Sequence, residues 1–257
     1  MPIEIQVAFL PCHLESAQIA SVDVAVVIDT FRFTTTAATA LAAGAECVAT
    51  TDSVESARAA AAQDASWLLC GERHCKPIDG FAMGNSPLEY TAKRVSGRKL
   101  LFTTTNGTRA VTAANGAPQV WLASLVNRHA ACRAIGDLRE SGVDPNVMII
   151  CAGTDGMVAT EDVLAAGAII DSVSMQEPKT VARGDSAHLA LAAWQRFDQK
   201  SDKQQLALQD VLKLAAGGAN LIKQGYASDV TFCSKLDSIN AVPISQGKNL
   251  AEHIFTL

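Results

Sequence analysis

Short apolar runs alternate along the chain with longer segments in which apolar residues recur at helical spacing. Runs rich in Val, Ile, Leu or Phe predict seven strands, at residues 4–10, 24–29, 46–50, 67–71, 99–104, 119–124 and 146–152. The segments between them, several rich in alanine, predict helices at 34–44, 53–63, 86–95, 107–115, 127–141 and 159–174. This alternation is typical of an α/β fold, with a mainly parallel sheet covered by helices on both faces.

The pattern changes near residue 175. Residues 186–224 predict a largely helical region, and residues 229–236 and 241–245 predict two closing strands. We expect the segment 175–186 to be a loop. It joins an α/β body at 1–175, which carries most of the site motifs, to a helical C-terminal part at 176–257, and the two are expected to form one continuous structural unit.

Composition narrows the class of protein. The chain has 257 residues, 49% hydrophobic and 18% charged, with a formal net charge of -5, which supports a large core and argues against disorder. The sequence contains no Lys/Arg cluster, which argues against binding to nucleic acid or to an anionic membrane. Seven scattered cysteines without a CxxC pair are typical of reduced, buried thiols. With no signal-like N-terminus and no apolar run of transmembrane length, we expect a soluble, cytoplasmic protein.

Polar side chains follow the predicted strands at the edge where α/β proteins bind ligands. Two of these segments contain a threonine triplet with an arginine nearby, "DTFRFTTT" and "TTTNGTRA". The candidate residues are Asp29, Arg32 and Thr35 after the second strand, Glu72 and Arg73 after the fourth, Thr105, Asn106, Gly107, Thr108 and Arg109 after the fifth, and Glu161 and Asp162 after the seventh.

These residue types point to an anion bound beside a cation. Hydroxyls, helix N-termini and arginines bind phosphate, and the carboxylates of Asp29, Glu72, Glu161 and Asp162 are hard oxygen ligands suited to Mg²⁺. Plainer structural roles are open for each. Threonine triplets and Asp29 can cap helices, and Glu161-Asp162 can stabilise the positive end of a helix dipole.

Several common phosphate-handling motifs are absent. The sequence has no G-x-x-x-x-G-K-[ST] motif, and Phe31 stands where a haloacid-dehalogenase-type phosphatase would carry a second aspartate after Asp29. Cys151 lacks the C-x5-R spacing of cysteine phosphatases because Met157 occupies the arginine position, so we interpret Cys151 as a buried thiol.

A family resemblance is carried by motifs in order along nearly the whole chain: "VVIDTFRFTTT", "GER" (71–73), "GFAMGNSPLEY" (80–90), "TTTNGTRA" (103–110), "CAG" (151–153), "EDVLAAGAII" (161–170) and "DVTFCSKLDSINAVP" (229–243). The set resembles the 2-phosphosulfolactate phosphatase family, known as ComB. The resemblance implies a three-layer α/β/α fold, a Mg²⁺-dependent hydrolysis of 2-phospho-3-sulfolactate to 3-sulfolactate and phosphate, a role in coenzyme M biosynthesis, and a homodimer.

Roles for the candidate residues follow from this resemblance. We expect a small anionic phosphorylated substrate, with Asp29, Arg32, Glu72 and Arg109 catalytic and Asp29, Glu72, Glu161 and Asp162 binding the metal. The expected substrate-binding residues are Thr35, Arg73, Asn85, Ser86, Thr105, Asn106, Gly107 and Thr108.

The sequence departs from the family pattern at Ala82, where the family commonly has Asp after Gly-Phe, and at Phe31-Arg32-Phe33, where it often has Leu-Arg-Ala. A missing carboxylate at position 82 leaves two alternatives open. One is a phosphatase for another phosphorylated hydroxyacid, and the other is a non-catalytic protein that binds a phosphorylated metabolite.

Overall fold

The computed structural model describes residues 2–142, 144–196, 202–245 and 253–257. All seven predicted strands form, and four short strands join them. The strands are β1 (Glu4–Ala8), β2 (Val24–Ile28), β3 (Cys47–Thr50), β4 (Trp67–Arg73), β5 (Lys76–Pro77), β6 (Lys99–Thr103), β7 (Gln119–Ala123), β8 (Asn146–Cys151), β9 (Val181–Ala182), β10 (Ile244–Ser245) and β11 (Ile254–Phe255).

The helices fill the predicted intervals with two differences. They are α1 (Ser16–Ala20), α2 (Phe33–Ala42), α3 (Val54–Gln63), α4 (Ala92–Val95), α5 (Gly107–Ala113), α6 (Arg128–Glu140), α7 (Thr160–Gln176), α8 (Asp185–Gln195), α9 (Asp202–Leu214), α10 (Ala216–Lys223) and α11 (Ala227–Cys233). The single helix predicted at 86–95 is wrong, because a 3₁₀ turn at Pro87–Glu89 ends before α4 begins. The strand predicted at 229–236 is also wrong, because most of that segment is α11.

The strands form two sheets rather than one. The first has the order β10-β7-β2-β8-β1-β9 and the second the order β11-β3-β6-β4-β5. The pairs that involve β10, β11 and β5 are antiparallel, and the other pairs are parallel. The chain enters the second sheet after α2 and leaves it through α5, so β3, β4 and β6 come from one continuous segment.

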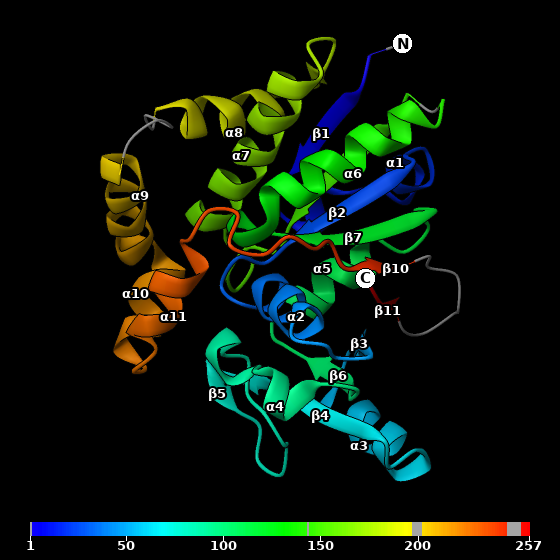
Figure 1. Ribbon diagram of the computed structural model, residues 1–257, viewed down its shortest axis with the longest axis vertical. Helices are drawn as coiled ribbons and strands as arrows, with labels where there is room; N and C mark the ends of the chain where they lie inside the picture. Colours follow the sequence, from blue (N-terminus) through cyan, green and yellow to red (C-terminus); the bar gives the residue numbers. More distant parts are fainter. Residues whose placement is uncertain (1, 143, 197–201, 246–252) are drawn as a thin grey trace.

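The first sheet is the centre of a three-layer α/β/α body (Figure 1). Alternate residues of β2 face opposite layers, as the period of two in a strand requires. Val24 and Val26 pack in a core with residues of α6, α7 and α8, whereas Ala25 and Val27 pack in a core with residues of α2 and α5. Because β2 is buried along its whole length, it is apolar at every position.

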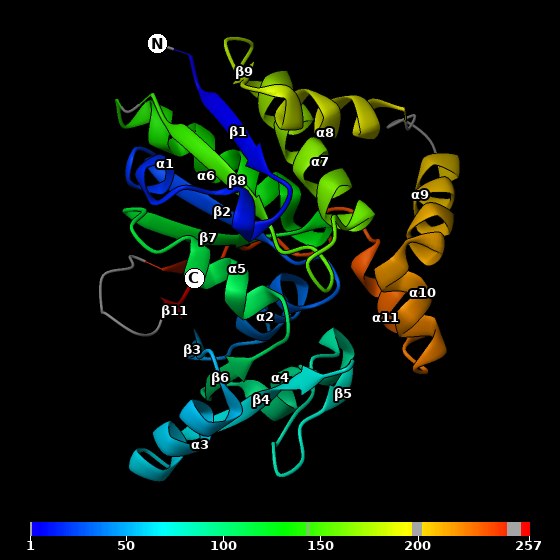
Figure 2. The same cartoon turned by 180° about the vertical axis from the view of Figure 1, so that it is seen from behind.

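The second sheet lies on the far side of α2. Val48, Leu100 and Phe102 share a core with α2 residues such as Phe33, and the opposite face packs on α3 through Leu101 and Ala57. Figure 2 shows β3, β4 and β6 below α2 and α5, with α3 outermost. Helices α2 and α5 therefore lie between the two sheets.

The C-terminal helices α9, α10 and α11 lie along one side of the molecule, beyond α7 and opposite the β4–β5 hairpin (Figures 1 and 2). Helices α8, α9 and α10 agree with the helical region predicted at 186–224, of which residues 197–201 lie outside the described residues. The short strand β9 lies within the expected loop at 175–186. Within the described residues, no helix combines the length and apolar character needed to cross a membrane.

Candidate active site

The carboxyl ends of four parallel strands from both sheets converge on one cavity of about 330 Å³. Residues just after β6 and β8, the end of β4 and the α2 entry line it, and α10 closes the opposite wall. The lining residues are Phe31, Arg32, Glu72, His74, Cys75, Thr105, Asn106, Thr154, Asp155, Gly217, Asn220, Leu221 and Gln224. The polar residues that follow the strands do come together, as the sequence predicts, but the strands belong to two sheets and not to one.

Asp29 follows β2 and is 6% exposed. The Thr34 amide and hydroxyl both donate to its backbone carbonyl, and its own amide is 3.0 Å from the Thr34 hydroxyl. Its carboxylate lies against Gly107, where an added Cβ would be only 2.5 Å from Asp29 Oδ2. A side chain at position 107 would therefore displace this carboxylate, which explains a glycine at the start of α5.

Glu161 has a similar environment in the first turn of α7. It is 1% exposed, its Oε2 atom has no hydrogen-bond partner among the described residues, and a Cβ on Gly217 of α10 would be 2.2 Å from its Oε1. The neighbouring Asp162 is fully partnered: Oδ1 accepts from the Thr30 amide at 2.9 Å and Oδ2 from the Gly153 amide at 3.0 Å. Asp162 therefore ties the β2 and β8 ends together.

Glu72 connects the second sheet to the same place. Its Oε1 accepts from the Thr105 amide at 2.8 Å and its Oε2 from the Cys75 amide at 2.9 Å. Each carboxylate oxygen has a further lone pair. Glu72 is 8% exposed and lines the cavity, so it can accept from or coordinate a ligand without losing these bonds.

Burial raises the pKa values of three carboxyl groups near the cavity, those of Asp29, Glu161 and Asp162. Burial, reinforced by Glu72 and Glu161, raises the pKa of Asp29 to about 7, although a backbone hydrogen bond from Phe33 and the charge of Arg32 oppose the shift. Burial also raises the pKa of Glu161 to about 7. The pKa of Asp162 is raised well above its usual range, again by burial first and then by Glu161 and Asp29. The group thus carries negative charge that a cation would relieve.

The fit of this group to Mg²⁺ can be judged from its oxygens. Over the described part of the chain, no three His, Cys, Asp or Glu side chains form a ready-made metal centre. Mg²⁺ usually takes one or two carboxylates and completes its shell with water and substrate phosphate. The Oε2 of Glu161, which has no partner among the described residues, and the buried carboxylate of Asp29 match that requirement. Glu72 and Asp162 each accept two backbone amides, but Glu72 lines the cavity and Asp162 does not, so Glu72 is the third candidate.

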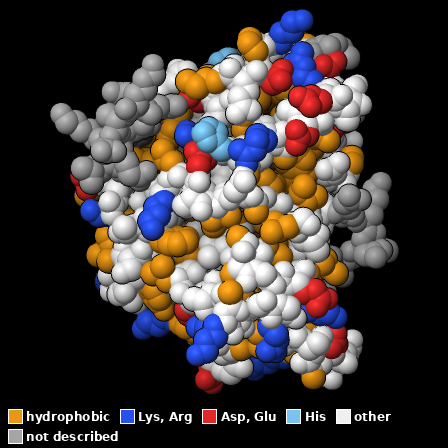
Figure 3. All heavy atoms as spheres, viewed as in Figure 1, with side chains coloured by type: hydrophobic (Ala, Val, Ile, Leu, Met, Phe, Trp, Pro, Cys, Tyr) orange, Lys and Arg blue, Asp and Glu red, His pale blue; other side chains and the backbone are white. Residues whose placement is uncertain are grey.

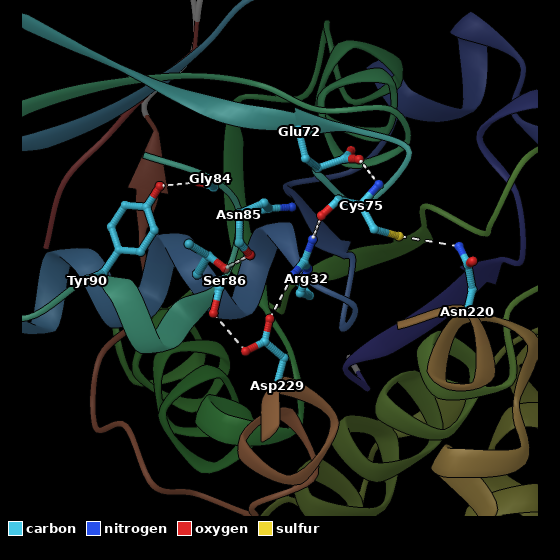
Figure 4. Close-up of polar contacts among 10 residues, drawn as sticks. Arg32, Glu72, Cys75, Gly84, Asn85, Ser86, Tyr90, Asn220 and Asp229 are labelled. Carbon is cyan, nitrogen blue, oxygen red and sulfur yellow. Dashed lines mark hydrogen bonds and ion pairs between the residues drawn. The ribbon is translucent and has the colours of Figure 1, made fainter. Parts of the chain in front are cut away.

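Arg32 lines the cavity and is almost completely buried, at 2% exposed. Its Nη1 forms an ion pair of 2.7 Å with Asp229 of α11, its Nη2 donates to the Cys75 carbonyl at 2.8 Å, and its guanidinium lies 4.4 Å from the centre of the Tyr226 ring. Figure 4 shows Arg32 between Cys75 and Asp229, with Ser86 donating to the other oxygen of Asp229. The arginine is held in one orientation.

The other two predicted arginines lie outside the lining. Arg73 points to the end of β6 and donates to the Thr103 carbonyl and hydroxyl and to its neighbour's carbonyl. Arg109 is exposed on α5. The structure therefore brings one of the three arginines to the cavity wall. The substrate-binding role of Arg73 and the catalytic role of Arg109 stay predictions.

The predicted hydroxyl and amide residues divide into two groups. Thr105 and Asn106 line the cavity, and the buried Thr105 hydroxyl has no partner among the described residues. The hydroxyls of three others are occupied elsewhere: Thr35 bonds to Thr30 and Ser124, Thr108 to Thr104, and Ser86 to Asp229. Asn85 accepts from Thr36 through its backbone carbonyl, but its buried side-chain Oδ1 has no hydrogen-bond partner among the described residues.

Sequence reasoning missed the cavity residues of the C-terminal helices. Asp229 holds Arg32, Asn220 donates to the Cys75 sulfur at 3.3 Å, and Gln224 also lines the wall. The motif "DVTFCSKL" contained Asp229, but interpreting that segment as a strand hid its role. Nothing in the pattern of α10 indicates that it faces β4.

Ala82, the departure from the family pattern, is exposed and is not a lining residue. Its amide donates to the Leu69 carbonyl in the middle of β4, three residues before Glu72. The missing carboxylate is therefore on the outer side of the second sheet, where its loss leaves the cavity wall unchanged.

The chain resembles proteins of one named family. The family model described as 2-phosphosulpholactate phosphatase matches residues 9–248. A probable 2-phosphosulfolactate phosphatase of Symbiobacterium thermophilum is 41% identical over 223 residues, 86% of this chain and 90% of the relative. Proteins of the same description from Caldanaerobacter subterraneus and Prochlorococcus marinus are 36% identical over 85% of this chain and 35% over 93%, covering 86% and 96% of the relatives.

Proposed function

The chain belongs to the 2-phosphosulfolactate phosphatase family, and we propose that it hydrolyses 2-phospho-3-sulfolactate to 3-sulfolactate and phosphate with the help of Mg²⁺. Family membership makes it a phosphoric monoester hydrolase. The observation that carries the proposal is the pair of buried carboxylates behind the cavity lining: Glu161 lies against the lining residue Gly217, and Asp29 interacts electrostatically with the lining residues Glu72 and Arg32. Their raised pKa values mark a site suited to a bound cation.

The charge of the cavity wall supports the need for a metal. The charged lining residues are Arg32, Glu72 and Asp155, and Arg32 is already paired with Asp229. A substrate with phosphate, carboxylate and sulfonate groups would meet net repulsion there. When bound, Mg²⁺ supplies the charge that neutralises the phosphoryl oxygens during transfer.

The chain's own residues bind and orient the substrate around that charge. Asp29 and Glu161, with Glu72 nearby, provide hard oxygen ligands from three segments of the fold. The free hydroxyl of Thr105 and the amide of Asn106 are placed to donate to phosphoryl oxygens. Arg32, fixed by Asp229 and the Cys75 carbonyl, adds a preorganised positive charge that needs no reorganisation during the reaction.

Three finer properties belong to the same proposal. The homodimer and the place in coenzyme M biosynthesis rest on the family resemblance, and the cytoplasmic location rests on the sequence features described above. On the face shown in Figure 3, acidic and basic side chains are interspersed, without a broad field of one sign. That surface supports a small substrate as the partner, in preference to nucleic acid or a membrane.

Phosphate release from a panel of phosphomonoesters tests the function. The panel contains 2-phospho-3-sulfolactate, 2-phospholactate, 3-phosphoglycerate and p-nitrophenyl phosphate, each with Mg²⁺ or with EDTA. We expect the highest kcat/KM for 2-phospho-3-sulfolactate, and only with Mg²⁺. A higher kcat/KM for another phosphorylated hydroxyacid would identify that compound as the substrate. Substrate binding without any phosphate release would indicate a non-catalytic protein.

A further inference from the structure

The hairpin turn between β4 and β5 contributes two side chains to the cavity from an unfavourable backbone conformation. Arg73 pairs with Lys76, so His74 and Cys75 are the only two residues of the loop. Both have positive φ, 53° and 66°. A two-residue hairpin with both φ values positive is a type I′ turn, which favours Asn and Gly because a Cβ is disfavoured there.

Three bonds lock the second residue of this turn to the site. The Cys75 amide donates to Glu72, its carbonyl accepts from Arg32, and its sulfur accepts from Asn220 of α10 (Figure 4). The turn is thus fixed relative to the carboxylates on one side and to the C-terminal helices on the other. Unfavourable backbone conformations that surrounding contacts maintain are concentrated at functional sites.

The first residue of the turn is left free to bind a ligand. His74 is exposed and lines the cavity, and its ring has no hydrogen bond to any described residue. Asn220 and Gln224 of α10 line the same cavity, and Asn220 reaches the turn through its bond to the Cys75 sulfur. These residues offer nitrogen hydrogen-bond donors, in contrast to Asp29, Glu72 and Glu161, whose carboxylates suit a metal.

We infer that His74, with Asn220 and Gln224 facing it, forms the specificity subsite for the sulfonate of the substrate, and that the type I′ turn keeps two side chains in place of glycines for this purpose. The inference rests on the proposed function. A sulfonate is a weaker ligand for Mg²⁺ than phosphate or carboxylate, so it is the group that remains for hydrogen-bond donors away from the metal. The phosphate and the carboxylate of the substrate are then left to Arg32 and to the Mg²⁺ that Asp29, Glu161 and Glu72 would hold.

Replacing the turn by its geometrically preferred residues tests this inference. The double variant H74G/C75G removes both side chains, keeps the positive φ values without a Cβ, and is expected to melt at or above the wild-type temperature. The readout is the ratio of kcat/KM for 2-phospho-3-sulfolactate to that for 2-phospholactate, which lacks the sulfonate. We expect this ratio to fall roughly tenfold, about the loss of one hydrogen bond to a charged group.

Two further variants serve as controls. His74→Asn keeps a donor and tolerates positive φ, so it should retain most of the discrimination. Lys76→Ala lies next to the turn, is exposed and is not a lining residue, so it should leave the ratio unchanged. An unchanged ratio in H74G/C75G would overturn the inference.

Binding of the product separates this inference from the proposed function. If wild type releases no phosphate from either substrate, the proposed function fails, and calorimetry with 3-sulfolactate and with lactate then decides the inference. A Kd for 3-sulfolactate that rises roughly tenfold in H74G/C75G, with no change for lactate, supports the subsite. Equal affinities of wild type and H74G/C75G for 3-sulfolactate would reject it.

Discussion

The two threonine triplets have the same sequence and both follow parallel strands, but their hydroxyl groups have different surroundings. Thr34, Thr35 and Thr36 are fully buried in the first turn of α2, and each hydroxyl bonds within the core. The second triplet is divided between the end of β6 and the loop after it. Its last member, Thr105, donates its amide to Glu72 and leaves its hydroxyl free beside the cavity.

This difference shows that position relative to the helix decides the function of a repeated motif. In the first turn of α2, Thr34 and Thr35 donate to backbone carbonyls five residues back and Thr36 donates to the Asn85 carbonyl, so each hydroxyl has a partner in the core. A threonine in the loop before the helix has no such carbonyl. The first triplet therefore positions Asp29, whereas the second presents the Thr105 hydroxyl to the cavity.

The largest expected effect is on the carboxylate that the second triplet contacts. Glu72→Gln keeps the shape of the side chain but removes the charge, so we expect kcat/KM to fall by roughly 10²–10³-fold, the range for losing one preorganised electrostatic group. Glu140→Gln, an exposed change at the end of α6, is the matched control. Glu72→Gln activity within threefold of wild type would remove Glu72 from the mechanism.

A matched pair of threonine variants separates the two triplets. Thr105→Val removes a hydroxyl without a partner, so we expect kcat/KM to fall by about tenfold with an unchanged free energy of unfolding. Thr35→Val removes the donor to the buried Thr30 carbonyl and Ser124 hydroxyl, so we expect a loss of about 1–3 kcal/mol in the free energy of unfolding.

The activity of the folded Thr35→Val protein should stay near that of wild type. Urea unfolding and kinetics on both variants make the comparison. If Thr35→Val loses activity while its stability is unchanged, the two triplets are equivalent after all, and both act as ligand-binding turns.

The carboxylates next to the triplets predict an unusual pH dependence of stability. The pKa values of Asp29 and Glu161 are raised to about 7, above about 3.9 and 4.3 in an unfolded chain. Between about pH 4 and pH 7 the native state therefore binds more protons than the unfolded state, so the free energy of unfolding falls as the pH rises through this window.

Calorimetry in EDTA should accordingly give a higher melting temperature at pH 5 than at pH 8. Mg²⁺ should raise the melting temperature at pH 8 and so reduce the difference between the melting temperatures at pH 5 and pH 8. The variant D29N/E161Q should lose most of the pH dependence. A melting temperature that rises from pH 5 to pH 8 in EDTA would contradict the assigned shifts.

The smallest expected effect is at the arginine of the second triplet's motif. Arg109 is exposed on α5 and is outside the cavity lining, in contrast to the buried Arg32. We expect Arg109→Ala to lower kcat/KM by less than about threefold, because an exposed charge is screened by solvent and salt. A hundredfold loss would show that Arg109 reaches the substrate.

The sequence predicted the local elements of the fold well and their assembly poorly. Apolar runs located all seven long strands, because burial on both faces leaves a strong signal. The same signal cannot tell which strands pair, so the separate sheet of β3, β4 and β6 was not predicted. The helix at 86–95 failed because Pro87 begins a 3₁₀ turn that ends before α4.

The site was predicted in part for a related reason. Asp29, Glu72 and Thr105 follow strands, and strand ends of parallel sheets have a known location relative to the ligand. Asp229 and Asn220 are on helices that reach the cavity only through tertiary packing, and local sequence carries no such information. The two "TTT" segments look equivalent in the sequence, but the first lies inside the first turn of its helix and the second lies before its helix. Local sequence therefore predicted the same role for two segments that differ in structure.

The central claim is that Asp29 and Glu161 hold a Mg²⁺ ion that hydrolysis requires. The most direct measurement is phosphate release from 2-phospho-3-sulfolactate during a Mg²⁺ titration of EDTA-treated protein, with calorimetric Mg²⁺ binding measured on wild type and D29N/E161Q. We predict no turnover in EDTA, full recovery with Mg²⁺ in wild type, and loss of both binding and activity in the double variant. Full turnover of wild type in excess EDTA would contradict the claim.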